Sequence, residues 1–164
     1  MAKRRFAKKE FKLWLDNIAK LTCKTDDNFT CQMQLSENCA GTMLPFDNNC
    51  QWCHIKSKQS YKVRWLAENA ITGCGQCHAY AHSNPDEFAD WFRENYPHRE
   101  KINLEANSKP SRIWREDDFK AMEKELLVEA KRVGVDDINM TEWHGYRERL
   151  KRKLKELRGT DARE

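Results

Sequence analysis

Two C-x-x-C-H units, residues 50–54 and 74–78, constrain the fold more strongly than any other feature of this sequence. The chain has seven cysteines and five histidines, and these units hold four of the cysteines and two of the histidines. In a reducing compartment such a set indicates metal ligands or reactive thiols before disulfides, and the odd cysteine count points the same way. Bound metal is therefore expected to order this segment.

The C-x-x-C-H sequence is also the attachment signature of haem c, and two copies would make a dihaem protein. We expect no secretory signal, because residues 1–16 lack its apolar core, whereas haem c attachment generally needs export. The residues between the two units are basic and strand- or loop-like, and Cys23, Cys31 and Cys39 would have no role. A cytochrome is therefore the least favoured interpretation.

A structural zinc site accounts for more of the cysteines. The expected ligands are Cys31, Cys39, Cys74 and Cys77. The C-x2-C spacing of the last two is usual for zinc, whereas the first two are separated by seven residues, so Cys50 and Cys53 remain competing ligands. Four thiolates would contribute roughly 10–16 kcal/mol of apparent binding free energy, as in zinc-finger peptides. Cys23 is expected to be a buried thiol.

Apolar residues at helical spacing predict helices on both sides of a turn-rich segment that covers residues 23–75. The expected helices cover 5–21, a stretch from near Cys74 through His82, a stretch after Asn84, 116–133, and a last segment that starts near Asp137 or Thr141. Asn84, Pro85 and Glu87 form a helix-start signal with Asn84 as the cap, and Pro97 is expected to end that helix. His54 is expected on a strand.

Charge is distributed unevenly along the chain. The formal net charge is +4, but residues 1–24 carry eight basic and two acidic residues, and residues 141–164 carry eight basic and five acidic residues. The middle is therefore acidic. Two basic ends indicate either a clamp for a polyanion such as nucleic acid or a device for solubility, and charge does not choose between them. No apolar run approaches the roughly 18–20 residues that cross a bilayer, so no membrane partner is expected.

Three histidines and one asparagine occur in an informative order. His78 and His82 are four residues apart on a predicted helix, so both imidazoles can hold one metal ion, although exposed helical pairs of this kind are common. His54 lies on a predicted strand, and Asn69 follows about fifteen residues later. This is the His-Asn-His order of a ββα-metal nuclease.

Residues 31–84 resemble the HNH endonuclease superfamily and, within it, the phage NinG (Rap) recombination endonuclease family. The shared elements are His54-Ile55, the basic loop Lys56 to Lys62, Arg64-Trp65, Glu68-Asn69, Cys74 to Cys77 and His78. The helix after Trp114 also resembles the C-terminal helix of that family. The likeness covers the central third of the chain well, the following helices loosely and residues 1–22 hardly at all.

The resemblance implies a site residue by residue. His54 would be the general base, because imidazole titrates near neutrality, and Asn69 would fix the His54 ring by a hydrogen bond. His78, with His82, would bind a catalytic divalent ion, Mg²⁺ or Mn²⁺, or Zn²⁺ if Cys53 takes part. The chain departs from the family at Cys53, where many HNH enzymes have a metal-binding Asp or His. The expected DNA contacts are Lys56, Lys58, Lys62, Arg64, Arg149 and Arg152.

The expected fold class is α+β: a small zinc-bound ββα-metal (HNH) core flanked by several α-helices, mostly helical overall. The expected divisions are a basic N-terminal helix (1–22), the nuclease core (23–84), a helical extension (85–134) and a basic C-terminal helix (135–164). The resemblance implies cleavage of branched or structured DNA in phage recombination, in the cytoplasm of a bacterial or phage-infected cell. The alternative is a non-catalytic zinc-bound nucleic-acid-binding module. The repeat from Trp143 to Leu157 fits either a homodimer seam or a helix packed on its own domain.

Overall fold

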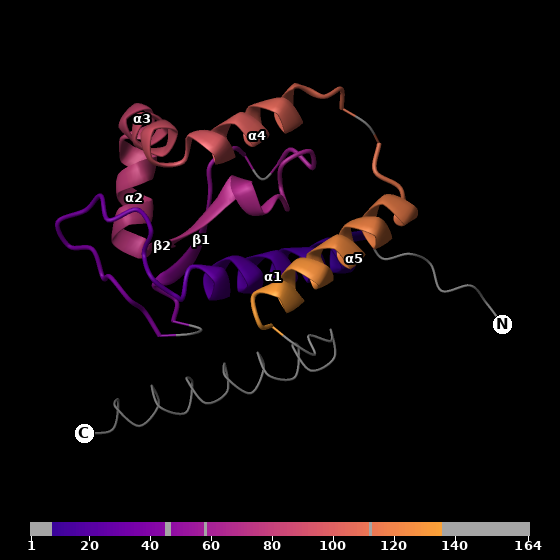
Figure 1. The fold of residues 1–164 in the computed structure, drawn as a ribbon, viewed down its shortest axis with the longest axis horizontal. Helices are drawn as coiled ribbons and strands as arrows, with labels where there is room; N and C mark the ends of the chain where they lie inside the picture. Colours follow the sequence, from indigo (N-terminus) through magenta and orange to yellow (C-terminus); the bar gives the residue numbers. More distant parts are fainter. Residues whose placement is uncertain (1–7, 45–46, 58, 112, 136–164) are drawn as a thin grey trace, which may run out of the picture.

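The computed structural model describes residues 8–44, 47–57, 59–111 and 113–135. The elements are α1 (Lys8–Asp26), β1 (Cys50–His54), the 3-10 helix η1 (Ala67–Asn69), β2 (Ala70–Cys74), α2 (Gly75–Ser83), α3 (Pro85–Asn95), α4 (Pro97–Ser108) and α5 (Glu116–Arg132). The fold is α+β, with helices around a small two-stranded sheet (Figure 1). Among the described residues, no helix combines the length and the apolar character needed to cross a bilayer.

The sheet and the helix after it form one continuous unit. β1 and β2 pair antiparallel, from Cys50 opposite Cys74 to His54 opposite Ala70. Every residue of β2 is buried. α2 follows β2 directly, and the Cys74 side chain caps it by accepting the backbone N–H of Cys77. The chain order is therefore strand, loop, strand, helix, with the strand at His54 and the helix from near Cys74 as the sequence predicts.

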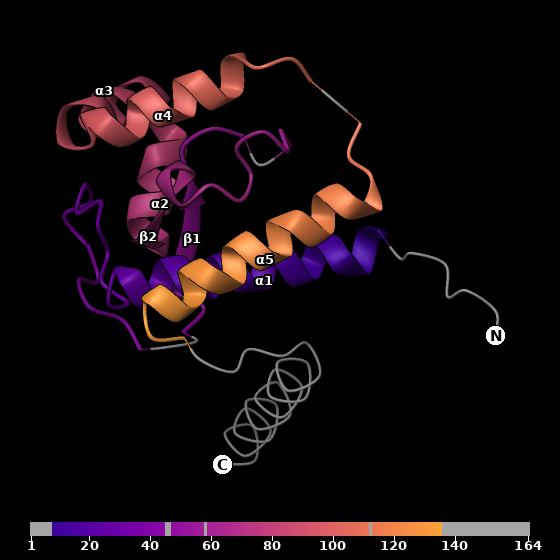
Figure 2. The same cartoon turned by 45° about the vertical axis from the view of Figure 1, so that its right-hand side comes forward.

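α1 and α5 lie side by side and run in the same direction (Figure 2). Their shared apolar surface is built from Leu15 and Ile18 of α1 and Phe119 and Leu126 of α5, with Trp65 from the loop before η1. Aromatic rings dominate this contact, and such rings bury large areas and prefer edge-to-face packing. The helix pair covers one side of the sheet.

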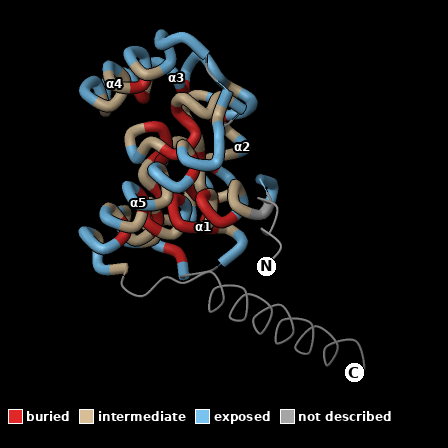
Figure 3. The backbone as a smooth tube through the Cα atoms, turned by 90° about the vertical axis from the view of Figure 1, so that its right-hand side faces the viewer, coloured by how far each residue is buried: buried red, intermediate tan, exposed pale blue. Residues whose placement is uncertain are grey.

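A second apolar cluster lies on the other side of the sheet, where α2 and α3 pack. Its largest members are Met33, Met43, Ile71, Phe88 and Phe92. Figure 3 shows that the buried segments run through the centre of the molecule, while the outer turns of the helices are exposed. Gly73 belongs to this contact, because a Cβ at its position would lie 2.0 Å from the Met33 methyl group. The two clusters hold the sheet between helical layers.

α4 is a helix that the sequence did not predict. α3 ends at Asn95, just before Pro97 as expected, and Pro97 is also the first residue of α4. Polar bonds rather than an apolar stripe attach this helix. An Arg99 N–H donates to the Ala70 carbonyl at 2.6 Å, and the Asn103 amide donates to the Glu68 carbonyl at 2.8 Å. Hydrophobic periodicity cannot report contacts of this kind.

The other expected helices agree with the structure over the described residues. The helices expected from near Cys74 and over 116–133 correspond to α2 and α5, and α1 continues beyond residue 21 to Asp26. The expected capping role of Asn84 is wrong, because its side chain does not cap α3 and donates instead to the Tyr80 carbonyl of α2. The helix expected after residue 136 lies outside the described residues.

Candidate functional site

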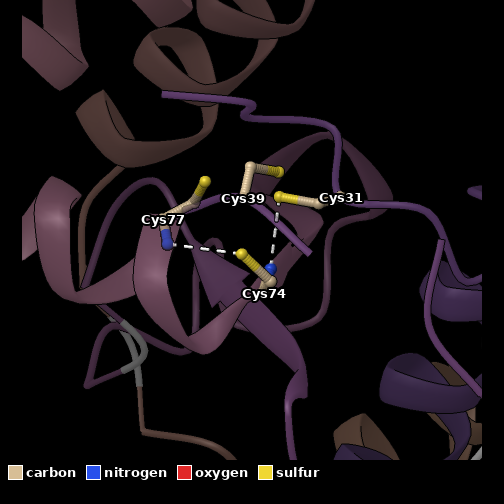
Figure 4. A group of neighbouring side chains, drawn as sticks. All are labelled: Cys31, Cys39, Cys74 and Cys77. Atoms are coloured by element: carbon tan, nitrogen blue, oxygen red, sulfur yellow. Dashed lines mark hydrogen bonds between the residues drawn. The ribbon is translucent and has the colours of Figure 1, made fainter. Parts of the chain in front are cut away.

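Four cysteines from distant parts of the chain converge on one point, as Figure 4 shows. They are Cys31, Cys39, Cys74 and Cys77, the four that the sequence predicts as zinc ligands. Their sulfur atoms all lie within 4.8 Å of one another, and three of the four residues are buried. This cluster can hold a metal ion.

The loop that carries the first two cysteines is shaped by its backbone. Thr30 and Thr42 form an antiparallel bridge, and the Cys31 N–H donates to the Gly41 carbonyl at 2.9 Å. Gly41 has a φ of +63°, a conformation in which a side chain would be strained. The Gln32 N–H donates to the Thr72 carbonyl of β2 at 2.9 Å. These bonds fold the loop back and bring its thiols to the sheet.

Backbone N–H groups point at the sulfur atoms of the cluster. The Cys74 N–H donates to Cys31 Sγ at 3.2 Å, and the Cys77 N–H donates to Cys74 Sγ at 3.4 Å. The Ser36 N–H donates to Cys77 Sγ at 3.4 Å, and the Gly41 N–H donates to Cys39 Sγ at 3.5 Å. Donors of this kind stabilise a thiolate more than a thiol. Each of the four sulfur atoms therefore accepts a backbone N–H.

The thiols of the cluster differ in acidity before any ion binds. Burial opposes ionisation of Cys74, but hydrogen bonds from the Ala40 and Cys77 backbones outweigh it and lower the pKa of Cys74 to about 7. Burial raises the pKa of Cys77 to about 12 and also raises the pKa of Cys31. Cys74 is thus about half ionised at neutral pH, and an ion would have to displace protons from Cys31 and Cys77.

The geometry fits a tetrahedral ion of zinc size. Zinc–sulfur bonds of about 2.3 Å place the sulfur atoms of a tetrahedral site about 3.8 Å apart, so a small contraction of the cluster would satisfy all four bonds. Cys50 and Cys53 lie outside the cluster, which removes them as competing ligands. Both are buried. Burial raises the pKa of the Cys53 thiol well above its usual value, and repulsion from Cys31 and Cys74 is a second, smaller cause of the same shift. Cys53 is therefore a protonated thiol of the apolar core.

The three predicted site histidines line one surface cavity of about 490 Å³. His54 comes from the end of β1, and His78 and His82 come from α2. Lys56 and Glu100 line the same cavity. Among the described residues, however, only the four-cysteine cluster brings three or more His, Cys, Asp or Glu side chains within ligand range of one another. The three histidines therefore share a cavity without forming a closed ligand cage.

The His54 ring is held on two sides. Its Nε2 lies 3.2 Å from the carbonyl oxygen of Arg64, and because a carbonyl can only accept, Nε2 carries the proton in this bond. The ring also lies against the Trp52 indole, with centroids 4.1 Å apart. In the neutral imidazole this arrangement makes Nδ1 the proton-accepting nitrogen.

His78 and His82 face each other across one turn of α2. Their Nε2 atoms are 3.1 Å apart, and tetrahedral bonds of 2.0–2.1 Å to one ion would place two such nitrogens about 3.3 Å apart. His78 Nδ1 donates to Gln51 Oε1 on β1. This bond fixes the tautomer of His78 and turns its Nε2 toward His82, as an outer partner does for a histidine that binds metal.

The expected bond from Asn69 to the His54 ring is wrong. The fully buried Asn69 amide bonds instead to the backbone of Lys56, accepting its N–H at 2.7 Å and donating to its carbonyl at 3.1 Å. The Ile55 N–H also donates to the Asn69 carbonyl at 2.9 Å. Asn69 therefore closes the loop that follows His54 and positions the ring only through the backbone.

The expected DNA contacts are corrected in one case. Arg64 is buried and forms a two-bond ion pair with Asp16 of α1, so its guanidinium does not face a phosphate. Lys56 pairs with Glu100 at 3.0 Å, and Lys62 donates to the Asn107 carbonyl at 3.0 Å, so both bind α4 in this state. Lys58, Arg149 and Arg152 lie outside the described residues.

Sequence reasoning missed three residues: Glu100, which lines the cavity, Gln51, which bonds to His78, and Asp16, which bonds to Arg64. Gln51 could have been suspected, because it is a polar residue three positions before the candidate base His54 on the same strand. Glu100 has one buried carboxylate oxygen without a hydrogen-bond partner. It lies on α4, and neither its position nor that of Asp16 leaves a signal in a linear pattern.

We compared the chain with models of protein families, with curated proteins and with solved structures, and none of the three comparisons found a match. The class of protein therefore rests on the fold and the site alone. It is an α+β protein with a four-cysteine centre able to hold a metal ion, beside a cavity lined by three histidines.

Proposed function

We propose that this protein is a metal-dependent DNA endonuclease of the HNH type, with a ββα-metal core formed by β1, β2 and α2. The observation that carries the proposal is the shared cavity, into which the end of β1 brings His54 and α2 brings His78 and His82. The same order of elements and residues characterises the superfamily that residues 31–84 resemble. A pure binding module would not need this combination.

His54 acts as the general base. The Arg64 carbonyl holds the proton on Nε2, so Nδ1 is the nitrogen that takes a proton from the water attacking a phosphodiester. The Trp52 ring restricts the orientation of the imidazole. A fixed tautomer and a fixed orientation are what a base needs for transfer in a defined direction.

His78 and His82 would hold the divalent ion, with Gln51 setting the tautomer of His78. When bound, such an ion stabilises the charge that develops on the phosphate and on the leaving 3′-oxygen. Two histidines leave most of the coordination shell to water and to phosphate oxygens. Oxygen ligands in that number suit Mg²⁺ or Mn²⁺, and a site of this kind would assemble fully only on its substrate.

The four-cysteine centre has a separate, structural role as a zinc site. It joins the loop over residues 29–43 to the start of α2, the helix that carries His78 and His82. A closed set of four thiolates leaves no position for water, so chemistry is assigned to the histidine cavity and not to this centre.

The substrate class is DNA, and the preference for branched or structured DNA in phage recombination rests on the family resemblance. The excess of basic residues in 1–24 and 141–164 supports binding of a polyanion beyond the cavity. The corresponding location is the cytoplasm of a bacterial or phage-infected cell, and a homodimer would suit symmetric cutting of a junction.

To test the proposal, zinc-loaded protein is incubated with labelled linear duplex and four-way-junction DNA in Mg²⁺ or Mn²⁺. Wild-type protein is expected to cut, and His54→Ala is expected to lose roughly 10²–10⁴-fold in rate, the contribution of a general base. His98→Ala is the matched control, because His98 is exposed on α4. Equal cleavage by wild type and His54→Ala would remove His54 as the base.

The second candidate function is a zinc-bound nucleic-acid-binding module without catalysis. One observation favours it: the cysteine centre brings four ligands together, whereas the histidines supply only a facing pair. This alternative predicts DNA binding that weakens steeply with salt and no cleavage with any divalent ion.

A further inference from the structure

Asp16 of α1 accepts three hydrogen bonds from two consecutive residues of the loop before η1. Arg64 donates its Nε to Oδ1 at 2.7 Å and its Nη2 to Oδ2 at 2.6 Å. The Trp65 indole N–H donates to Oδ1 at 2.8 Å. Paired bonds from a guanidinium to both oxygens of a carboxylate are geometrically specific as well as strong.

Arg64 and Trp65 flank a single peptide group, and its oxygen is the atom that accepts the His54 Nε2 proton. Asp16 therefore holds the side chains on both sides of the peptide that holds the candidate base. The backbone N–H of Arg64 also donates to the Ser60 carbonyl at 3.0 Å, which shapes the preceding turn.

The ion pair is shielded from water. The Arg64 side chain is 9% exposed and that of Asp16 is 19% exposed. A buried guanidinium without its counter-ion is costly, so rotating Arg64 away from Asp16 is strongly disfavoured. Trp65 is buried as well and stacks on Tyr61. Both donor side chains are therefore buried where they meet Asp16.

We infer that Asp16 is a positioning residue for His54, acting through the Arg64–Trp65 peptide. α1 lies in the part of the chain that the family resemblance hardly covers, so this contact comes from the structure alone. The kinetic part of the inference rests on the proposed nuclease function. The structural part does not, since the placement of the His54 ring exists without substrate.

The test is Asp16→Asn in the zinc-loaded full chain, with ¹⁵N NMR of the histidine side chains. In the wild type, His54 is expected to carry its proton on Nε2, protected from solvent exchange by the Arg64 carbonyl. Asp16→Asn removes the charge that holds Arg64, and exchange of this proton is expected to quicken by at least about tenfold. With DNA, kcat is expected to fall by roughly 10–100-fold with little change in KM, because the base is misplaced.

Asp26→Asn is the matched control, because Asp26 lies at the exposed end of α1, the helix that also carries Asp16. Asp26 pairs there with Arg132 of α5. It is expected to leave both readouts unchanged. A wild-type His54 protonated on Nδ1, or unchanged exchange in Asp16→Asn, would overturn the inference.

Should Asp16→Asn fail to fold, Trp65→Phe removes one of the three bonds and keeps the ion pair. A smaller change in the same direction is then expected, and an unchanged His54 signal again overturns the inference.

The two hypotheses fail in different ways. If the wild type cuts no DNA but the Asp16→Asn exchange changes as expected, the proposed function falls and the positioning role stands. If the wild type cuts DNA and the exchange does not change, the positioning role falls and the nuclease stands.

Discussion

The backbone N–H of Cys74 donates to Cys31 Sγ at 3.2 Å, although the two residues are 43 positions apart in the chain. This bond joins the folded-back loop over residues 29–43 to the junction of β2 and α2. Backbone N–H donors point at the other three sulfur atoms of the four-cysteine cluster as well. An ion there would lock the position of the helix that bears His78 and His82.

Cys31→Ser is expected to abolish tight zinc binding, because one of four ligands is lost and the remaining three cannot close the site. Metal analysis of the purified protein should fall from about one zinc per chain to near zero. Cys50→Ser is the matched control, since Cys50 is equally buried but lies outside the cluster. Zinc loss from Cys50→Ser with retention in Cys31→Ser would reassign the ligands.

Zinc binding is expected to release more protons at pH 6 than at pH 8. The pKa of Cys74 lies at about 7, so this thiol is mostly protonated at pH 6 and mostly ionised at pH 8. The ion displaces the Cys74 proton only where it is present, which adds about 0.8 proton per zinc at the lower pH. Apparent zinc affinity should fall accordingly as the pH falls through 7.

Calorimetry in buffers with different ionisation enthalpies measures this proton count. Cys77, whose pKa is raised to about 12 by burial, is protonated at both pH values and contributes equally to both measurements. The same proton release at pH 6 and pH 8 would contradict the lowered pKa of Cys74.

The elements that the sequence predicted are those whose signals are local. Spacing of apolar residues indicated α1, α3 and α5, and the C-x2-C pair together with two more distant cysteines indicated the metal centre. α4 was not predicted, because polar bonds from Arg99 and Asn103 attach it to the rest of the fold. Such bonds leave no periodic pattern in the sequence. The sequence predicts Arg64 as a phosphate contact because its true partner, Asp16, is 48 residues away in the chain. A sequence does not show whether a charged side chain is exposed to solvent or paired with a residue far away in the chain.

Gln51→Leu is expected to weaken divalent ion binding at the histidine pair by roughly 10–100-fold, the usual cost of losing an outer partner of a metal-binding histidine. Without the Gln51 oxygen, His78 is free to place its proton on the nitrogen that faces His82. Mn²⁺ titration followed by electron paramagnetic resonance measures the affinity. Gln76→Leu, on the exposed face of α2, is the control and should bind Mn²⁺ as the wild type does.

The zinc content of Gln51→Leu should stay at the wild-type level, because Gln51 does not belong to the cysteine cluster. If Mn²⁺ affinity were unchanged in Gln51→Leu and in His78→Ala, the histidine pair would not be the divalent site.

Asn69→Ala is expected to destabilise the fold by about 1–3 kcal/mol, because it leaves the Lys56 N–H and carbonyl without their buried partner. Urea denaturation of the zinc-loaded protein measures the free energy of unfolding. Asn107→Ala changes the same residue type at an exposed position of α4 and should stay within about 0.5 kcal/mol of the wild type. Equal stabilities for the two variants would show that Asn69 does not close the loop after His54.

Phe119→Ala is expected to cost about 3–5 kcal/mol, the usual range for removing a buried aromatic ring. Phe119 is fully buried on α5, and its ring meets Phe11 of α1 edge to face with centroids 6.5 Å apart. Trp65 contacts the same ring at 6.0 Å, so the cavity left behind would also loosen the loop that holds His54. The comparison is Val128→Ala on the same helix, whose side chain is 72% exposed and whose loss should change stability by less than about 0.5 kcal/mol. Thermal unfolding of both variants decides the matter, and a Phe119→Ala midpoint near that of Val128→Ala would mean that the contact between α1 and α5 does not support the core.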